Sequence, residues 1–215
     1  MATRGRAAHS KGSAYERKIA KTLSKGFKTD VERTGGSGSY RGIRSEYNHS
    51  DTIGKNGFVG DLFFPQTHPM SIFNYELKNH AGVKLIHFFN SNGEIPSFVE
   101  QVVTDSNRLG GVNHSVPCLI IHVNREDDYV VIPFEPVTYE SLTKAGSTMI
   151  TLLSYKQEQT GNTYRYQVIV TNLTNFMTLD PTTTYHQYHH LDWNQLNHNL
   201  ATPKDKSVDE ILGDL

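Results

Sequence analysis

Residues 73–78, within an expected strand at 72–78, alternate strictly between apolar and polar side chains, and this pattern constrains the fold more than any other feature of the sequence. Its apolar members are Phe73, Tyr75 and Leu77, and its polar members are Asn74, Glu76 and Lys78. A period of two is typical of a β-strand with one buried face and one polar face. A second apolar stretch, 59–64, precedes it across a loop that contains Pro65 and Pro69. The two stretches therefore predict a β-hairpin.

The remainder of the chain predicts helices mixed with strands. A helix is expected to begin near Ser13 and to end at Gly26, because an S-x-x-E capping box precedes apolar residues spaced four apart. The other expected elements are a strand at 27–33, a helix at 97–109, strands at 118–123 and 129–133, and a hairpin of 149–155 with 164–171. This order predicts an α/β domain with a mixed sheet.

The formal net charge of −1 conceals a strong asymmetry along the chain. Residues 1–60 hold 12 basic and 5 acidic side chains, whereas residues 61–215 hold 9 basic and 17 acidic ones. A basic first part and an acidic remainder predict an N-terminal surface that contacts a polyanion.

Composition excludes several classes of protein. No apolar run approaches the roughly 20 residues of a membrane span, and the first residues lack the apolar segment of a secretory signal. A single cysteine, Cys118, excludes an intramolecular disulfide and a cysteine-based zinc cluster. We therefore expect a cytoplasmic protein, in the host cytoplasm if the source is viral.

Two carboxylates of the predicted hairpin carry the most informative chemistry. Pairing Asp61 with Glu76 centres the turn inside the Pro-bounded loop, and both side chains then lie on one sheet face with Lys78. Two hard oxygen ligands suit Mg²⁺, which also accepts substrate phosphate, and a nearby ammonium can orient a water or stabilise charge on phosphate. The alternative is a solvated sheet face, the commoner use of such residues.

Glu16 is a further candidate acid with two interpretations. It is the fourth residue of the capping box and could serve only to cap the helix. If the helix packs beside the hairpin, Glu16 adds a third carboxylate to Asp61 and Glu76.

At this point the residues resemble a known superfamily. A Gly-Asp61 pair followed by Glu76-x-Lys78 is similar to the active-site pattern of the PD-(D/E)xK nucleases. The segment KGSAYER at 11–17, together with Gly26-Phe27, Arg33 and Ser37-Gly38, resembles the archaeal-type Holliday junction resolvases. The resemblance covers roughly residues 11–123. It implies a restriction-endonuclease-like fold, a mixed β-sheet flanked by helices, here with a C-terminal extension.

The resemblance also implies a chemistry and its residues. Glu16, Asp61 and Glu76 match the family's metal-binding acids, and Lys78 matches its catalytic lysine. The expected activity is a metal-dependent endodeoxyribonuclease that hydrolyses phosphodiester bonds, with Mg²⁺ as cofactor and Mn²⁺ as a substitute. The expected assembly is a homodimer acting on branched DNA, above all the four-way junction.

A set of basic and polar residues is expected to contact DNA. Its simplest alternative is a solvated helix face and a flexible glycine-rich connection. Phosphate contacts of this kind do not depend on base sequence and suit an enzyme that recognises DNA shape. The expected DNA-binding residues are Lys11, Arg17, Arg33, Ser37, Ser39, Arg41 and Gln101.

Four segments follow from these patterns. We expect a basic flexible arm at 1–12, a nuclease core at 13–135, a C-terminal extension of unknown role at 136–204 and an acidic tail at 205–215. The tail is either a frayed terminus or a peptide that docks a protein partner.

Two other functions stay open. One is a nuclease of the same fold with another substrate, such as duplex ends, flaps or a restriction site. The other is a non-catalytic DNA-binding recombination factor, although such a module has no use for a buried carboxylate pair.

Overall fold

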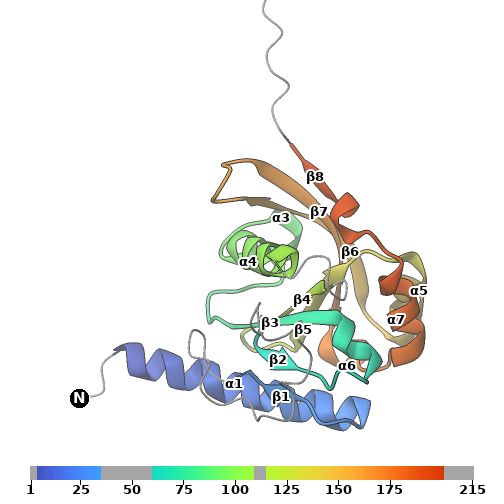
Figure 1. Cartoon of the computed structure of the whole chain (residues 1–215). Helices are drawn as coiled ribbons and strands as arrows, with labels where there is room; N and C mark the ends of the chain where they lie inside the picture. Colours follow the sequence, from blue (N-terminus) through green and yellow to red (C-terminus); the bar gives the residue numbers. More distant parts are fainter. Residues whose placement is uncertain (1–3, 35–59, 109–114, 201–215) are drawn as a thin grey trace, which may run out of the picture.

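The computed structural model describes residues 4–34, 60–108 and 115–200, and these residues build one mixed β-sheet with helices on both of its faces (Figure 1). Within these residues the sheet has eight strands in the order β1-β2-β3-β4-β5-β7-β6, and β8 pairs with β7. No helix among the described residues is long and apolar enough to cross a membrane. The expected α/β class is confirmed.

The sheet is mixed because one of its neighbouring pairs is parallel. Strand β3 pairs parallel with β4, and every other pair is antiparallel. The strands are β1 (Glu32–Arg33), β2 (Leu62–Phe63), β3 (Phe73–Asn79), β4 (Val116–His122), β5 (Asp128–Pro133), β6 (Thr148–Lys156), β7 (Thr163–Asn172) and β8 (Asn197–Asn199). The helices are α1 (Arg4–Phe27), α3 (Ile86–Asn90), α4 (Ile95–Arg108), α5 (Pro136–Ala145), α6 (Leu173–Phe176) and α7 (Pro181–His189), with 3₁₀ turns η2 (Pro69–Ile72) and η3 (Trp193–Leu196).

The alternation of β3 sorts its side chains onto two differently covered faces. Phe73 packs edge-on against Phe176 of α6 and Tyr188 of α7, and Tyr75 stacks on Phe64, with ring centroids 5.0 Å apart. The polar residues of β3 face α4. In Figure 1, α1 lies on one side of the sheet and α4 on the other. Both faces of β3 are therefore buried, rather than one as the alternation predicted.

The first helix differs from the prediction at its start. It begins at Arg4, so it includes most of the segment expected to be a flexible arm. Ser13 is buried inside the helix, and the capping-box interpretation of Ser13 and Glu16 is therefore wrong. The same helix continues to Phe27, which leaves a strand of two residues, Glu32–Arg33, in place of the one expected at 27–33.

The segment after residue 135 continues the sheet of the first part. Strands β6 and β7 form the predicted hairpin, and β7 also pairs with β5. The buried Glu135 carboxylate caps α5, because it accepts bonds from the backbone N–H groups of Val137 and Thr138. The division expected at residue 135 therefore does not coincide with a break in the sheet.

The predicted hairpin register is confirmed at Leu62, which pairs with Tyr75. Just before this pair, Gly60 adopts a φ of +93°, and an added Cβ would lie 2.4 Å from Asn74 Oδ1 and 2.8 Å from the Tyr75 carbonyl oxygen. Backbone of this kind is available to glycine at little cost but not to residues with a side chain. Gly60 thus allows β2 to approach β3 closely where Asp61 enters the hairpin.

We predict that Gly60→Ala lowers the free energy of unfolding by about 1–3 kcal/mol, through positive-φ strain and the clash with β3. Chemical denaturation measures the change. Gly82→Ala is the matched control, because its added Cβ would meet nothing within 4 Å. An equal, small effect of both substitutions would contradict the steric role of Gly60.

Candidate active site

Asp61 is fixed against β3 by its own backbone and side chain. Its N–H donates to the Tyr75 carbonyl oxygen over 2.6 Å, and its Oδ2 accepts the Leu77 N–H over 2.8 Å. A carboxylate oxygen here takes the place of the backbone acceptor that β2 would otherwise offer. Thr34 completes the attachment, because its N–H donates to the Asp61 carbonyl oxygen over 3.0 Å. The carboxylate is therefore held in one position.

Glu76, Lys78 and Gln101 form a closed triangle of hydrogen bonds. Glu76 Oε1 accepts Lys78 Nζ over 2.7 Å and Gln101 Nε2 over 2.9 Å, while Lys78 Nζ also donates to Gln101 Oε1 over 2.7 Å. The side chains of Glu76 and Lys78 are only 8% and 16% exposed. Alternation on β3 places Glu76 and Lys78 on one face, and α4 brings Gln101 over them. Lys78 Nζ also lies 5.3 Å from the centre of the Phe98 ring, which favours the cation.

The two carboxylates are held at an electrostatic cost. Burial, followed by the negative charge of Glu76, raises the pKa of Asp61 to about 7, although the Leu77 N–H and Lys78 act in the opposite direction. Burial also raises the pKa of Glu76, against the attraction of Lys78. Buried like charges resist ionisation together unless a cation compensates them. The site therefore offers carboxylate oxygens as ligands, together with negative charge that a divalent cation would compensate.

Glu16 lies close enough to raise the pKa of both Asp61 and Glu76, but it is bound elsewhere. Its Oε2 forms an ion pair with Arg33 Nε. Among the residues that the structure describes, no three His, Cys, Asp or Glu side chains are placed to hold one metal ion. The structure thus brings Asp61 and Glu76 together as a pair and holds Glu16 beside them through Arg33.

The expected DNA-binding residues have different surroundings. Arg17 is exposed on α1, and the backbone of Lys11 belongs to the same helix. Arg33 binds Glu16, and Gln101 binds Glu76 and Lys78. Three further residues of the set fall outside the described residues: Ser37, Ser39 and Arg41.

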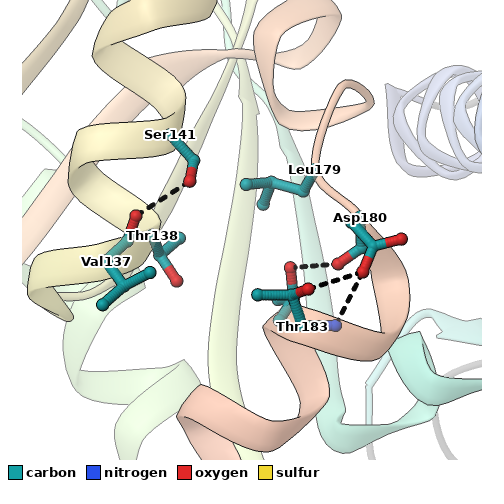
Figure 2. Close-up of a pocket in the computed structure, with 7 residues that line it drawn as sticks. Val137, Thr138, Ser141, Leu179, Asp180 and Thr183 are labelled. Carbon is teal, nitrogen blue, oxygen red and sulfur yellow. Dashed lines mark hydrogen bonds between the residues drawn. The ribbon is translucent and has the colours of Figure 1, made fainter.

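A separate pocket of about 150 Å³ lies between α5 and α7 (Figure 2). Its polar groups already serve the helices. Asp180 caps α7 through the N–H and hydroxyl of Thr183, and Ser141 donates to the Val137 carbonyl oxygen. The remaining lining residues are Thr138, Leu179 and Thr184. The one charged residue that lines this pocket, Asp180, already caps α7. The carboxylate pair is therefore the better candidate site.

A mixed sheet flanked by helices, with an Asp just before one strand and a Glu and a Lys on the next, is consistent with a restriction-endonuclease-like fold and with the PD-(D/E)xK class of nucleases. The family model described as phage putative PDDEXK endonuclease matches residues 7–186, and the chain belongs to that family. Nucleases of this class generally use divalent metal ions. Comparison with curated proteins gives no match, and comparison with solved structures gives none either.

Sequence reasoning missed two features around the site: a hydrogen bond from Asn74 to α4 and a neighbouring acid on α4. Asn74 lies two residues before Glu76 on the same face and donates to Ser106 Oγ of α4 over 3.1 Å. Asp105 of α4 contributes to the raised pKa of Glu76. The period of two could have identified Asn74, whereas Ser106 and Asp105 depend on how α4 packs.

We predict that Asp61→Asn stabilises the metal-free protein at pH 8, by on the order of 2 kcal/mol. The pKa of Asp61, raised to about 7, means that the folded protein binds a proton between about pH 4 and pH 7 that the unfolded chain releases. The free energy of unfolding of the unsubstituted protein therefore falls as pH rises through this window. The asparagine can still accept the Leu77 N–H without this penalty, so its advantage should shrink toward pH 4.

Denaturation curves in EDTA across pH 4–8 measure this gain. Asp180→Asn is the control, because hydrogen bonds from Thr183 lower the pKa of Asp180 and its charge favours the fold. It should give no gain at pH 8. A stability difference for Asp61→Asn that is independent of pH would contradict the electrostatic account.

Proposed function

We propose that this protein is a Mg²⁺-dependent, structure-selective DNA endonuclease that cleaves four-way junctions, as a Holliday junction resolvase does. The observation that carries the proposal is the buried Asp61–Glu76 pair with Lys78 held beside it, in a chain of a PDDEXK endonuclease family. The resemblance of the first helix and the following loop to junction resolvases supports this substrate. Homodimerisation and action in a host cytoplasm are part of the same proposal.

Asp61 and Glu76 are the residues that would hold the metal. Two carboxylates are the hard donors that Mg²⁺ prefers, and Mn²⁺ accepts a similar oxygen set. When bound, such an ion supplies charge stabilisation at a phosphoryl oxygen and a more acidic water. Glu16 contributes a third negative charge near the pair, and it is itself paired with Arg33.

Lys78 is the group proposed to act on the attacking water and on phosphate. Its ammonium is fixed by Glu76 and Gln101 and lies close to the Phe98 ring. An ammonium fixed before substrate binds needs little reorganisation to orient a water or to meet developing negative charge. Asp61 is positioned by the Leu77 N–H, so the two ends of the site are set by the same strand, β3.

We predict that Asp61→Asn or Glu76→Gln abolishes cleavage of a synthetic four-way junction, by at least about 100-fold, because each removes one charged ligand of the metal. Junction binding should change little, because these acids do not attract phosphate. A gel assay with and without Mg²⁺ measures cleavage. Glu140→Gln, an exposed acid on α5, is the matched control and should cleave normally.

The same assay separates the alternatives. Labelled junctions, flaps, blunt duplexes and supercoiled plasmid identify a PD-(D/E)xK nuclease with another substrate by the DNA that is cut. A non-catalytic recombination factor would bind the junction whether or not Mg²⁺ is present and would yield no product from any DNA. Unreduced cleavage by Asp61→Asn or Glu76→Gln would exclude this site as the catalytic one.

Gln101 has two possible roles that sequence alone does not distinguish: positioning Lys78 and Glu76, or contacting DNA. If it positions Lys78 and Glu76, Gln101→Leu should lower the cleavage rate about tenfold with an unchanged Kd for the junction. Both ends of the amide bond within the triangle, Oε1 to Lys78 and Nε2 to Glu76, so this result is the expected one. A weaker Kd with an unchanged cleavage rate would instead show that Gln101 contacts DNA.

A further inference from the structure

One carboxylate outside the proposed catalytic set gathers three donors. Asp128, at the start of β5, accepts the Tyr15 hydroxyl over 3.2 Å and His122 Nδ1 over 2.8 Å on Oδ1. Its Oδ2 accepts Lys18 Nζ over 2.9 Å. The Asp128 side chain is only 9% exposed. Asp128 therefore joins α1 to the β4–β5 hairpin and orients both a lysine and a histidine.

An open pocket of about 340 Å³ lies directly on this cluster. It is lined by Ala14, Tyr15 and Lys18 of α1 and by the last residues of two parallel strands, Asn79 of β3 and His122 of β4. Ligands of open α/β sheets commonly bind beyond the carboxyl ends of parallel strands. Asn79 directly follows Lys78 in β3, and because successive strand residues point to opposite faces, the pocket lies on the α1 side of the sheet at the same end of β3.

The pocket presents donors, because its one negative charge lies behind them. Asp128 is not part of the lining, and both of its oxygens are occupied. His122 donates its Nδ1–H to Asp128, and in the imidazolium form its Nε2 carries a second N–H for a ligand. Lys18 has three N–H donors and uses one of them on Asp128. Asn79 adds an amide, and the exposed Arg17 and Lys21 add positive charge on the same helix.

We infer that this pocket binds a backbone phosphate of the DNA substrate, through Lys18 and His122. The inference rests on the proposed nuclease function and deepens it, because it names a phosphate contact of the substrate on the α1 side of the sheet. A phosphate fits this donor set, which combines the Lys18 ammonium, the Nε2–H of a protonated His122 and the Asn79 amide. Asp128 is a positioning residue in this arrangement.

The test measures the Kd of a fluorescently labelled four-way junction, and of a linear duplex, in EDTA at several salt concentrations. Each phosphate contact made by a cation contributes about 0.9 to the slope of log K against log salt. Lys18→Ala should weaken binding on the order of tenfold and reduce that slope by about one. Lys144→Ala is the matched control, because Lys144 is also paired with a carboxylate but lies on α5. A slope for Lys18→Ala equal to that of the control overturns the inference.

Two substitutions of His122 separate ligand binding from a structural role. Asparagine places its amide nitrogen near the position of Nδ1 and keeps the bond to Asp128, whereas glutamine places its amide nitrogen near the position of Nε2. Phosphate binding predicts that His122→Asn weakens the junction complex on the order of tenfold, while His122→Gln stays within about twofold. The reverse order would show that the imidazole only supports Asp128, and would overturn the inference.

Because the measurements are made in EDTA, they do not depend on cleavage. A reduced slope for Lys18→Ala in a protein that cuts no DNA would leave the phosphate subsite standing and remove the proposed nuclease function. Normal junction cleavage with an unchanged slope would do the opposite.

Discussion

The bond from the Leu77 N–H to the Asp61 carboxylate is the interaction on which the site depends. It adds a side-chain bond to the backbone bond from the Asp61 N–H to Tyr75, and it places one acid against the strand that carries Glu76 and Lys78. The positive φ of Gly60 makes this approach sterically feasible. The backbone at Gly60 thus determines how closely the chain before β2 approaches β3 and where the Asp61 carboxylate lies.

The remainder of the fold offsets the cost in folding free energy of this site. Two carboxylates with raised pKa values oppose folding in the absence of a cation. On the opposite face, Phe73 and Tyr75 pack against aromatic rings from other elements. Burial of aromatic surface is among the largest favourable contributions to folding, so the apolar face of β3 offsets the cost of its polar face. The strands after residue 135 extend the same sheet and enlarge this core.

Much of the proposed site could be predicted from sequence, because its parts are close in the chain. The hairpin register, the shared face of Glu76 and Lys78 and the α/β class all follow from local periodicity and from one Pro-bounded loop. The start of the first helix was predicted wrongly, because the local S-x-x-E signal at Ser13 is weaker than the advantage of continuing a helix that packs on the sheet. The ion pair between Glu16 and Arg33 depends on two elements meeting across an interval that local patterns do not span.

The sequence by itself determined which residues could do chemistry: an Asp and a Glu at hairpin spacing, a lysine two residues later and a basic N-terminal part. Tertiary structure decided which groups those residues contact. Packing of α4 on β3 converted Gln101 from a candidate DNA contact into the residue that holds Lys78 and Glu76. The meeting of α1 with β4 and β5 placed Tyr15, Lys18, His122 and Asp128 in one cluster. The physical reason is that periodicity specifies the face on which a side chain lies, whereas its partner is chosen only when separate elements pack.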